Sequence, residues 1–292
     1  MQARTVPLAS LAIVVAMASV NVGAALGKGL FPLVGPEGVA ALRTSIAALI
    51  LLVVARAWSA RFTGGQALWM VLYGIALGGM NLLIYWAIAR IPIGIAVTIE
   101  ICGPLAIVLL TSRTAKDFIW FALAVAGLLL LVPWPGAGTN LDPVGVLYAL
   151  GAATCWALYI LFGKRAAEAE SGIAVAVGMA FACLVTVPVG ISAAGSNLLL
   201  PQVLGLGLVV AVLSSALPYY LEMRALEKLS SRIFGLVTSS APAIAALVGF
   251  FVLGERLTPV QWLAVCMMIA ASAGCSLASK PPVERPSEDV MS

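Results

Sequence analysis

Histidine is absent from this sequence, and charged residues make up only 10% of its 292 positions. The absence of histidine excludes most histidine-based hydrolases, zinc proteases and haem-binding proteins. Aspartate is also scarce, because Asp117, Asp142 and Asp289 are the only aspartates and none lies deep within an apolar run. Neither a G-x-S-x-G nor an H-E-x-x-H motif occurs. The sequence therefore predicts that the protein is not an enzyme, and in particular not one that works inside a membrane.

The five cysteines show no pattern of a metal site or a disulfide framework. All lie within apolar runs, and no two have the C-x-x-C spacing: Cys102, Cys155, Cys183, Cys266 and Cys275. We interpret them as small buried hydrophobic residues and expect neither a metal nor another cofactor. The net charge of +4 comes from basic residues scattered between the apolar runs, so no nucleic-acid partner is expected.

Apolar residues dominate instead: 62% of the chain is hydrophobic and the mean hydropathy is +1.11. A helix needs roughly 20 predominantly apolar residues to cross a lipid bilayer, and runs near this length recur along nearly the whole sequence. The pattern predicts an all-α, multi-pass membrane protein with ten transmembrane helices. We place them at about residues 8–31, 38–57, 67–89, 92–112, 117–134, 144–162, 173–194, 201–223, 231–253 and 259–278.

The ten predicted spans divide into two halves of five. The run PWPGAGTNLDP, residues 133–143, is the clearest turn signal and separates a first repeat, residues 1–138, from a second, residues 139–279. A shift of 138 residues places Pro104 on Pro242, so each half has a proline within its fourth span. Residues 280–292 are polar and contain proline, and we expect a disordered cytoplasmic tail there.

The distribution of basic residues predicts the orientation. Of the 16 lysines and arginines, only Lys28, Arg90 and Arg256 fall on the predicted outer side, while Arg43 lies within a span. This asymmetry places both termini in the cytoplasm. An odd number of spans per half then gives the two repeats opposite orientations. Inverted repeats are typical of secondary transporters, whose binding sites lie near the bilayer midplane beside broken helices.

Residues 92–112 carry the strongest functional signal, because Glu100 is the one carboxylate in an otherwise apolar span. A charge at this depth costs about 3 kcal/mol on insertion scales, and such residues usually mark a substrate or proton path. Pro104 has no N–H to offer the carbonyl of Glu100, and Gly103 precedes it, so we expect the helix to break here. The alternative is a kinked helix whose glutamate is satisfied by a neighbour such as Arg43.

Other polar and aromatic residues fall near the middle of their predicted spans and suit an amino-acid pocket. The candidates for substrate binding are Asn21, Asn81, Trp156, Tyr159, Ser239 and Ser240. Pro218 frees the carbonyl of Ser214, which makes it a candidate gate hinge together with Pro242. Tyr85 could serve as an interface residue as easily as a pocket wall, and Arg43 could reach the interface from its position near a span end.

Four segments resemble one transporter family across nearly the whole chain. They are GGMNLLIYWAIARIPIGIAVTIEICGPLAIVLLTSR (residues 78–113), LGAATCWALYILFGKRA (150–166), SSALPYYLEMRALEKLSSRIFG (214–235) and GERLTPVQWLA (254–264). These segments look like the drug/metabolite transporter superfamily, and within its EamA family they are most similar to the threonine and homoserine exporter group. The resemblance implies ten helices in two inverted halves, a bacterial inner-membrane location and export of amino acids from the cytoplasm.

One position departs from that group, which tends to have an acidic residue before the second kink proline where this chain has Ala241. Glu100 would then carry the charge alone. A broad-specificity drug or metabolite exporter and, less favoured, a small-solute channel remain alternatives at this stage. No ATP-binding motif occurs, so the driving force is an ion gradient, an exchange partner or the substrate gradient, with protons as a candidate coupling ion.

Overall fold

The computed structural model describes residues 2–59, 64–111, 115–131, 141–166, 171–218, 221 and 237–278. Every regular element in these ranges is a helix. Five are long and apolar enough to span a membrane: Leu8–Lys28, Phe31–Val54, Gly64–Ile88, Pro143–Gly163 and Ile173–Leu199. Shorter apolar helices cover Ile93–Ile107, Pro201–Ala216, Ala241–Leu253 and Pro259–Gly274. The predicted tail and most of the predicted inter-repeat turn lie outside the described residues.

The described residues of the first half form six α-helices: α1 (Gln2–Lys28), α2 (Phe31–Val54), α3 (Gly64–Ile88), α4 (Ile93–Glu100), α5 (Cys102–Thr111) and α6 (Ala115–Leu131). Helix α2 begins before the predicted residue 38. It continues through Gly35, whose positive φ of 66° interrupts the helical backbone near the start. Glycine tolerates this conformation because it has no Cβ. Regular helical turns resume directly after Gly35, close to the predicted start of this span at about residue 38.

The described second half begins with α7 (Pro143–Ala166) and α8 (Ser171–Ala194), followed by α9 (Pro201–Ala211). Helix α9 runs into a π-helical turn, Val212–Ala216. The last two helices are α12 (Ala241–Leu253) and α13 (Pro259–Ala278).

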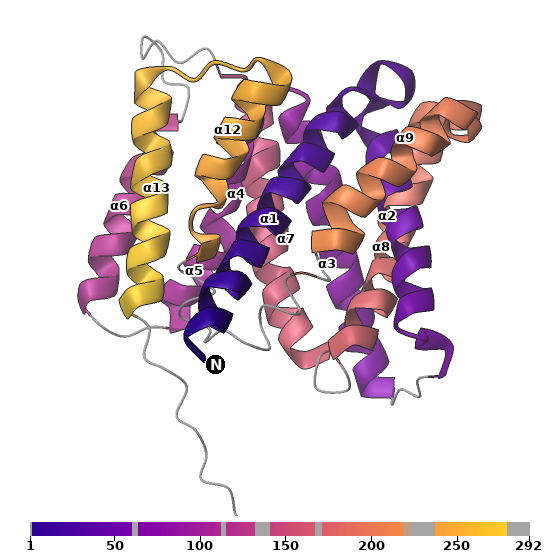
Figure 1. Ribbon diagram of the computed structural model, residues 1–292, viewed down its shortest axis with the longest axis horizontal. Helices are drawn as coiled ribbons and strands as arrows, with labels where there is room; N and C mark the ends of the chain where they lie inside the picture. Colours follow the sequence, from indigo (N-terminus) through magenta and orange to yellow (C-terminus); the bar gives the residue numbers. More distant parts are fainter. Residues whose placement is uncertain are drawn as a thin grey trace, which may run out of the picture.

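The helices form one bundle in which partners come from both halves (Figure 1). Helix α2 packs on α8, α3 packs on α7 and α8, and α6 pairs with α13 at one edge. Helix α1 lies between α12 and the π-helical turn that follows α9, and α4 contacts α12 and α7. The start of α1 and the end of α13 lie at the same end of the bundle. Segments distant in sequence therefore meet around its centre.

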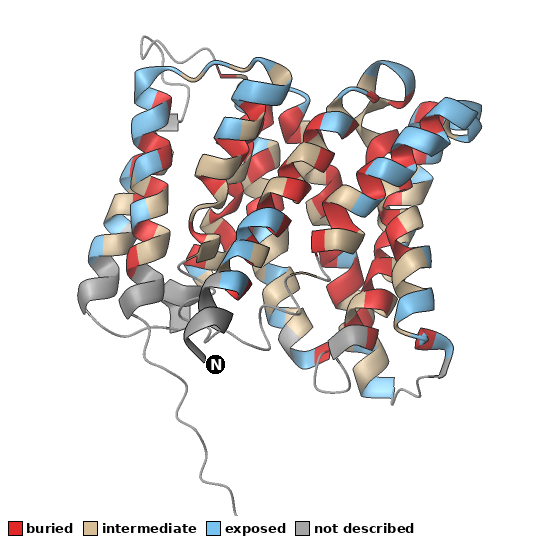
Figure 2. Cartoon of the chain, in the orientation of Figure 1, coloured by how far each residue is buried: buried red, intermediate tan, exposed pale blue. Residues whose placement is uncertain are grey.

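Burial follows the pattern expected for a protein surrounded by lipid. Buried residues line the contacts between helices, and exposed positions cover the outer faces (Figure 2). Many of those exposed residues are large and apolar, including Leu49, Val54 and Phe251. Exposed apolar area of this extent is unusual for a soluble monomer and indicates contact with another apolar phase.

Both predicted proline sites coincide with helix ends. Helix α4 ends at Glu100 and α5 begins at Cys102, so Pro104 lies in the first turn of α5. Pro242 occupies the corresponding place in the first turn of α12. Proline is tolerated in a first turn because its missing N–H would have no intrahelical partner there. At the first site, Gly103 lets α5 approach α7 so closely that any Cβ would collide with the carbonyl oxygen of Ala153.

Charged side chains join the helices at one end of the bundle, where α1 and α12 finish and α4 starts (Figure 1). The Lys28 Nζ lies 2.7 Å from the Glu255 Oε1, and the backbone N–H of Ile93 donates to the Glu255 Oε2 at 2.9 Å. Nearby, the Arg90 Nη1 donates to the Asp142 Oδ2 at 2.8 Å. This end is therefore tied by polar contacts between the two halves.

Candidate functional site

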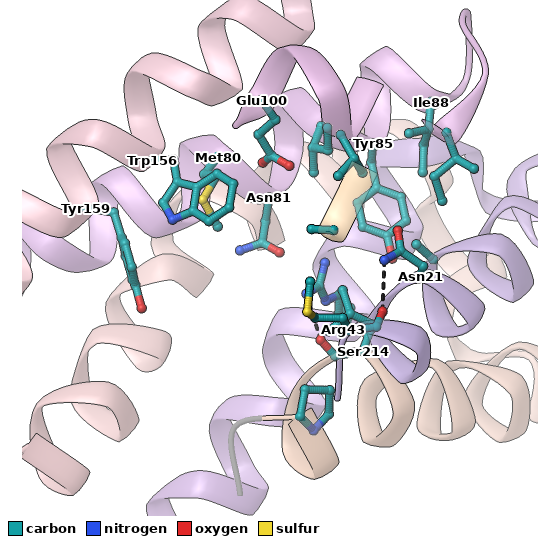
Figure 3. A pocket seen from close by; sticks show the side chains of 18 of the residues that line it. Asn21, Arg43, Met80, Asn81, Tyr85, Ile88, Glu100, Trp156, Tyr159 and Ser214 are labelled. Carbon is teal, nitrogen blue, oxygen red and sulfur yellow. Dashed lines mark hydrogen bonds between the residues drawn. The ribbon is translucent and has the colours of Figure 1, made fainter. Parts of the chain in front are cut away.

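A cavity of about 230 Å³ lies among helices of both halves. Its walls come from α1, α2, α3, α4, α7 and the segments that flank the breaks in the second half. The lining residues are Met17, Val20, Asn21, Ala24, Arg43, Met80, Asn81, Ile84, Tyr85, Ile88, Ile93, Val97, Glu100, Trp156, Tyr159, Ser214, Pro218, Thr238 and Ala241. Apolar groups dominate this set, and the few polar groups converge from different helices (Figure 3).

The structure brings most of the predicted binding residues to this cavity. Glu100, Asn21, Asn81, Trp156 and Tyr159 all line it, as does the predicted hinge residue Pro218.

Ser239 and Ser240 are not among the lining residues, although their neighbours Thr238 and Ala241 are. The hydroxyl of Ser240 turns back to donate to the carbonyl of Val237 at 2.7 Å. Gly103, Pro104 and Pro242 also stand outside the wall, in the helix starts that shape it. Their placement suits helix breaks rather than contact with a ligand.

Glu100 is the acidic residue of the cavity wall and the last residue of α4. It is only 9% exposed. Within the described part of the chain its carboxylate has neither a hydrogen-bond partner nor a salt bridge. Arg43 is the charged residue that acts on it through space. A buried charge without a direct partner is costly, so this carboxylate is suited to meet a group that arrives from outside.

Two asparagines face the cavity with the same local geometry. The Asn21 Nδ2 donates to the carbonyl of Met17 at 2.8 Å, and the Asn81 Nδ2 donates to that of Leu77 at 2.8 Å. Each bond spans one helical turn and fixes the amide, leaving its oxygen as an acceptor for a ligand. In Figure 3, Asn81 lies between Glu100 and Arg43.

The aromatic wall belongs to α7. The ring of Tyr159 stacks on Tyr73 of α3 with centroids 4.7 Å apart, and Trp156 lies one turn earlier on the same helix. Figure 3 shows both rings on the side of the cavity away from Tyr85. Large rigid rings of this kind give a ligand an apolar surface.

Two residues of this site were left undecided by sequence reasoning. Tyr85 is fully buried and lines the cavity, so it is not an interface residue. The sequence did contain a signal for this position: Tyr85 follows Asn81 by four residues, and residues four apart share one face of a helix. Arg43 also points inward and lines the cavity instead of reaching the bilayer surface.

Arg43 holds the broken end of α9. Its Nη2 donates to the carbonyl of Ser214 at 2.8 Å, and its Nε donates to the hydroxyl of Ser215 at 3.1 Å. The Ser214 carbonyl is the one that Pro218 leaves without its helical donor, as the sequence predicts. The neighbouring carbonyl of Leu213 accepts a bond from the Ser19 hydroxyl at 2.6 Å. Helices α1 and α2 therefore satisfy two carbonyls that a π-helical turn before a proline leaves open.

Comparisons with known proteins agree with this architecture. Residues 143–277 match the EamA-like transporter family. The chain is 49% identical over 265 residues to the threonine/homoserine exporter RhtA of Escherichia coli K12, covering 91% of this chain and 90% of that protein. The same identity holds over 267 residues for the threonine/homoserine exporter RhtA of Salmonella typhimurium LT2, with the same coverage.

More distant similarities include a protein of a third bacterium and a solved structure. The uncharacterized transporter YwfM of Bacillus subtilis is 29% identical over 172 residues, covering 58% of this chain and 57% of that protein. A crystal structure with 20% identity superimposes with a TM-score of 0.57, covering 95% of this chain and 98% of the other, and it supports the fold alone. The chain therefore belongs to the EamA-like transporter family, as a multi-pass membrane transporter of small molecules and not an enzyme.

Proposed function

We propose that this protein exports amino acids of the threonine and homoserine type from the cytoplasm across the bacterial inner membrane. The observation that carries the proposal is the Glu100 carboxylate, which lines the central cavity without a direct partner among the described residues. The substrate's ammonium group supplies the missing partner. The names of the 49% identical relatives point to the same substrates.

The size of the cavity favours a small metabolite over a drug. Pockets for drug-sized ligands usually measure about 300–1,000 Å³, and this cavity measures about 230 Å³. Its wall combines one carboxylate, two amides and aromatic rings. Such a set can bind an ammonium group, a hydroxyl and a short apolar side chain together.

Glu100 acts alone as the cavity's acidic group in this proposal. Ala241, which stands where related exporters tend to have an acidic residue, also lines the cavity. A charged Glu100 binds the ammonium group, and a protonated Glu100 releases it. We infer that protons couple to export through this exchange, since a proton and an ammonium group compete for the same carboxylate.

The contacts between helices support two inverted repeats related by a pseudo-twofold axis. A twofold axis that exchanges the halves would make the contact of α1 with α12 equivalent to the contact of α7 with α4 and α5. Both contacts are present in the structure. The same exchange relates α2–α9 to α8–α3, and α3–α7 to the contacts of α1 with α9 and its π-helical turn. The pairs α2–α8 and α6–α13 map onto themselves. Five spans per half then give opposite orientations, with both termini cytoplasmic.

Alternating access follows from this arrangement, because the cavity lies between the halves and polar contacts tie one end. With the termini inside, the tied end faces outward.

Transport into proteoliposomes tests the proposal. The panel is threonine, homoserine, methionine, an aromatic amino acid and a cationic drug, each measured with and without a proton gradient. We expect saturable flux and counterflow for threonine and homoserine. Flux of the drug without flux of any amino acid would contradict the proposal, and non-saturable flux without counterflow would indicate a channel.

A further inference from the structure

The cavity contains a second polar cluster, on the side opposite the aromatic wall (Figure 3). It consists of Arg43 and Tyr85, next to Ser214 at the broken end of α9. The Arg43 guanidinium carbon lies 5.8 Å from the centroid of the Tyr85 ring. Unlike the carboxylate of Glu100, this cluster offers hydrogen-bond donors.

Arg43 has donors to spare. A guanidinium carries five N–H groups, and two of them are engaged by the Ser214 carbonyl and the Ser215 hydroxyl. Neither of the two salt bridges in the described ranges includes Arg43. The bonds to the π-helical turn fix the guanidinium at the cavity wall, and they engage two of its five N–H groups.

Tyr85 supplies an independent observation. Its side chain is 0% exposed, and its hydroxyl is the one buried side-chain polar atom of the described residues that has no hydrogen-bond partner. It lies beside Arg43 and Ser214 without meeting hydrogen-bond geometry. Buried polar groups are nearly always paired, so an unpaired hydroxyl at a cavity wall indicates that a ligand completes it.

We propose that Arg43 and the Tyr85 hydroxyl bind the substrate's carboxylate while Glu100 binds its ammonium group. This inference rests on the proposed export of amino acids and extends it. A guanidinium and a hydroxyl are both suited to a carboxylate, and charge-assisted bonds of this kind are the strong ones. The site thus selects molecules that carry both charges, and it rejects an ester or an amine that lacks the carboxylate.

Tyr85→Phe is the decisive variant, because it removes the hydroxyl and breaks no bond of the described structure. Proteoliposomes containing the full chain are assayed with threonine and with threonine methyl ester, which lacks the carboxylate. We expect wild-type protein to prefer threonine by at least tenfold. In Tyr85→Phe the KM for threonine should rise about tenfold, and inhibition by the ester should stay unchanged.

Tyr148→Phe is the matched control, since Tyr148 contacts Trp86 and Arg90 and does not line the cavity. It should leave both measurements within twofold of wild type. Arg43→Lys keeps the charge and tests the guanidinium fork, with folding checked by size-exclusion chromatography. We expect Arg43→Lys to weaken the binding of threonine more than the binding of its methyl ester.

Three outcomes separate the possible failures. If Tyr85→Phe weakened the binding of threonine and of its methyl ester equally, the carboxylate subsite would be refuted, whereas the proposal of amino-acid export would be unaffected. Equal transport of both compounds by wild-type protein would do the same. No threonine or homoserine flux in wild type, in vesicles that retain folded protein, would overturn the proposed function itself and the subsite with it.

Discussion

Replacing Glu100 by glutamine removes the charge from the cavity wall and keeps the size of the side chain. No hydrogen bond or salt bridge of the described chain is lost, because the carboxylate makes none there. A buried charge is also harder to accommodate than a neutral amide. Glu100→Gln should therefore fold with a thermal midpoint equal to or above that of wild type.

Its effect on substrate binding should be large. A hydrogen bond to a charged group contributes about 1.5–3 kcal/mol, which corresponds to a factor of about 10 to 150 in affinity at 1.4 kcal/mol per tenfold. We expect the KM for threonine to rise within this range. Because glutamine does not titrate, the variant's flux should also lose its dependence on the proton gradient.

The assay compares initial rates in proteoliposomes at matched amounts of folded protein. Glu37→Gln is the control, because Glu37 accepts a bond from the Trp86 Nε1 at 2.7 Å and does not line the cavity. Glutamine can accept the same bond, so transport should remain within twofold of wild type. A Glu100→Gln protein that is unstable yet transports at an unchanged rate per molecule would refute the reasoning, because Glu100 would then be structural.

Three further predictions address packing, pH and topology. Gly103→Ala should cost about 1–3 kcal/mol of stability, because its Cβ would meet the Ala153 carbonyl; a lower thermal midpoint in detergent checks this, and an unchanged one would contradict the close α5–α7 contact. The Arg90 hydrogen bond lowers the pKa of Asp142, so the stability it adds is present above the unfolded pKa of about 3.9 and is lost as pH falls through the lower native value. Thermal midpoints of wild type and Asp142→Asn should differ at pH 7 and converge at low pH, whereas a constant difference would exclude the ion pair. Finally, a fluorescent reporter fused to the last residue should fluoresce and an alkaline phosphatase fused there should be inactive, because the proposed topology places both termini in the cytoplasm; active phosphatase would refute the ten-span topology.

The helix breaks beside the site and its carboxylate could be predicted from the sequence, because the signals for them are local. Glu100 stands out as a lone carboxylate in an apolar run, and the missing N–H of Pro104 predicts the helix end that the structure shows at Glu100. The same argument predicted an open Ser214 carbonyl before Pro218. These inferences need only the spacing of a proline from a carbonyl, which any helix preserves.

The donor to that carbonyl could not be predicted, because Arg43 is remote in sequence and reaches Ser214 only through the packing of α2 on α9. The positions of Ser239 and Ser240 relative to the cavity could not be predicted for a different reason. Helical periodicity predicts which side chains share a face only while the helix continues, and here a turn intervenes before α12. The register beyond the break is therefore set by tertiary contacts, which place Thr238 and Ala241 on the cavity instead.

Glu255 follows the end of α12 and joins this helix to two others. One carboxylate oxygen contacts Lys28 at the end of α1, and the other accepts a hydrogen bond from the N–H of Ile93 at the start of α4. Its side chain is 12% exposed and that of Lys28 is 28% exposed, so salt screens this contact less than a surface pair. Because Glu255 belongs to the second half and both of its partners belong to the first, the alternating access proposed above requires this contact to separate before substrate can leave. In that cycle the Glu255 contact would contribute both to the activation barrier of release and to the tightness of the outer seal, so a variant that weakens it should turn over faster only by leaking more.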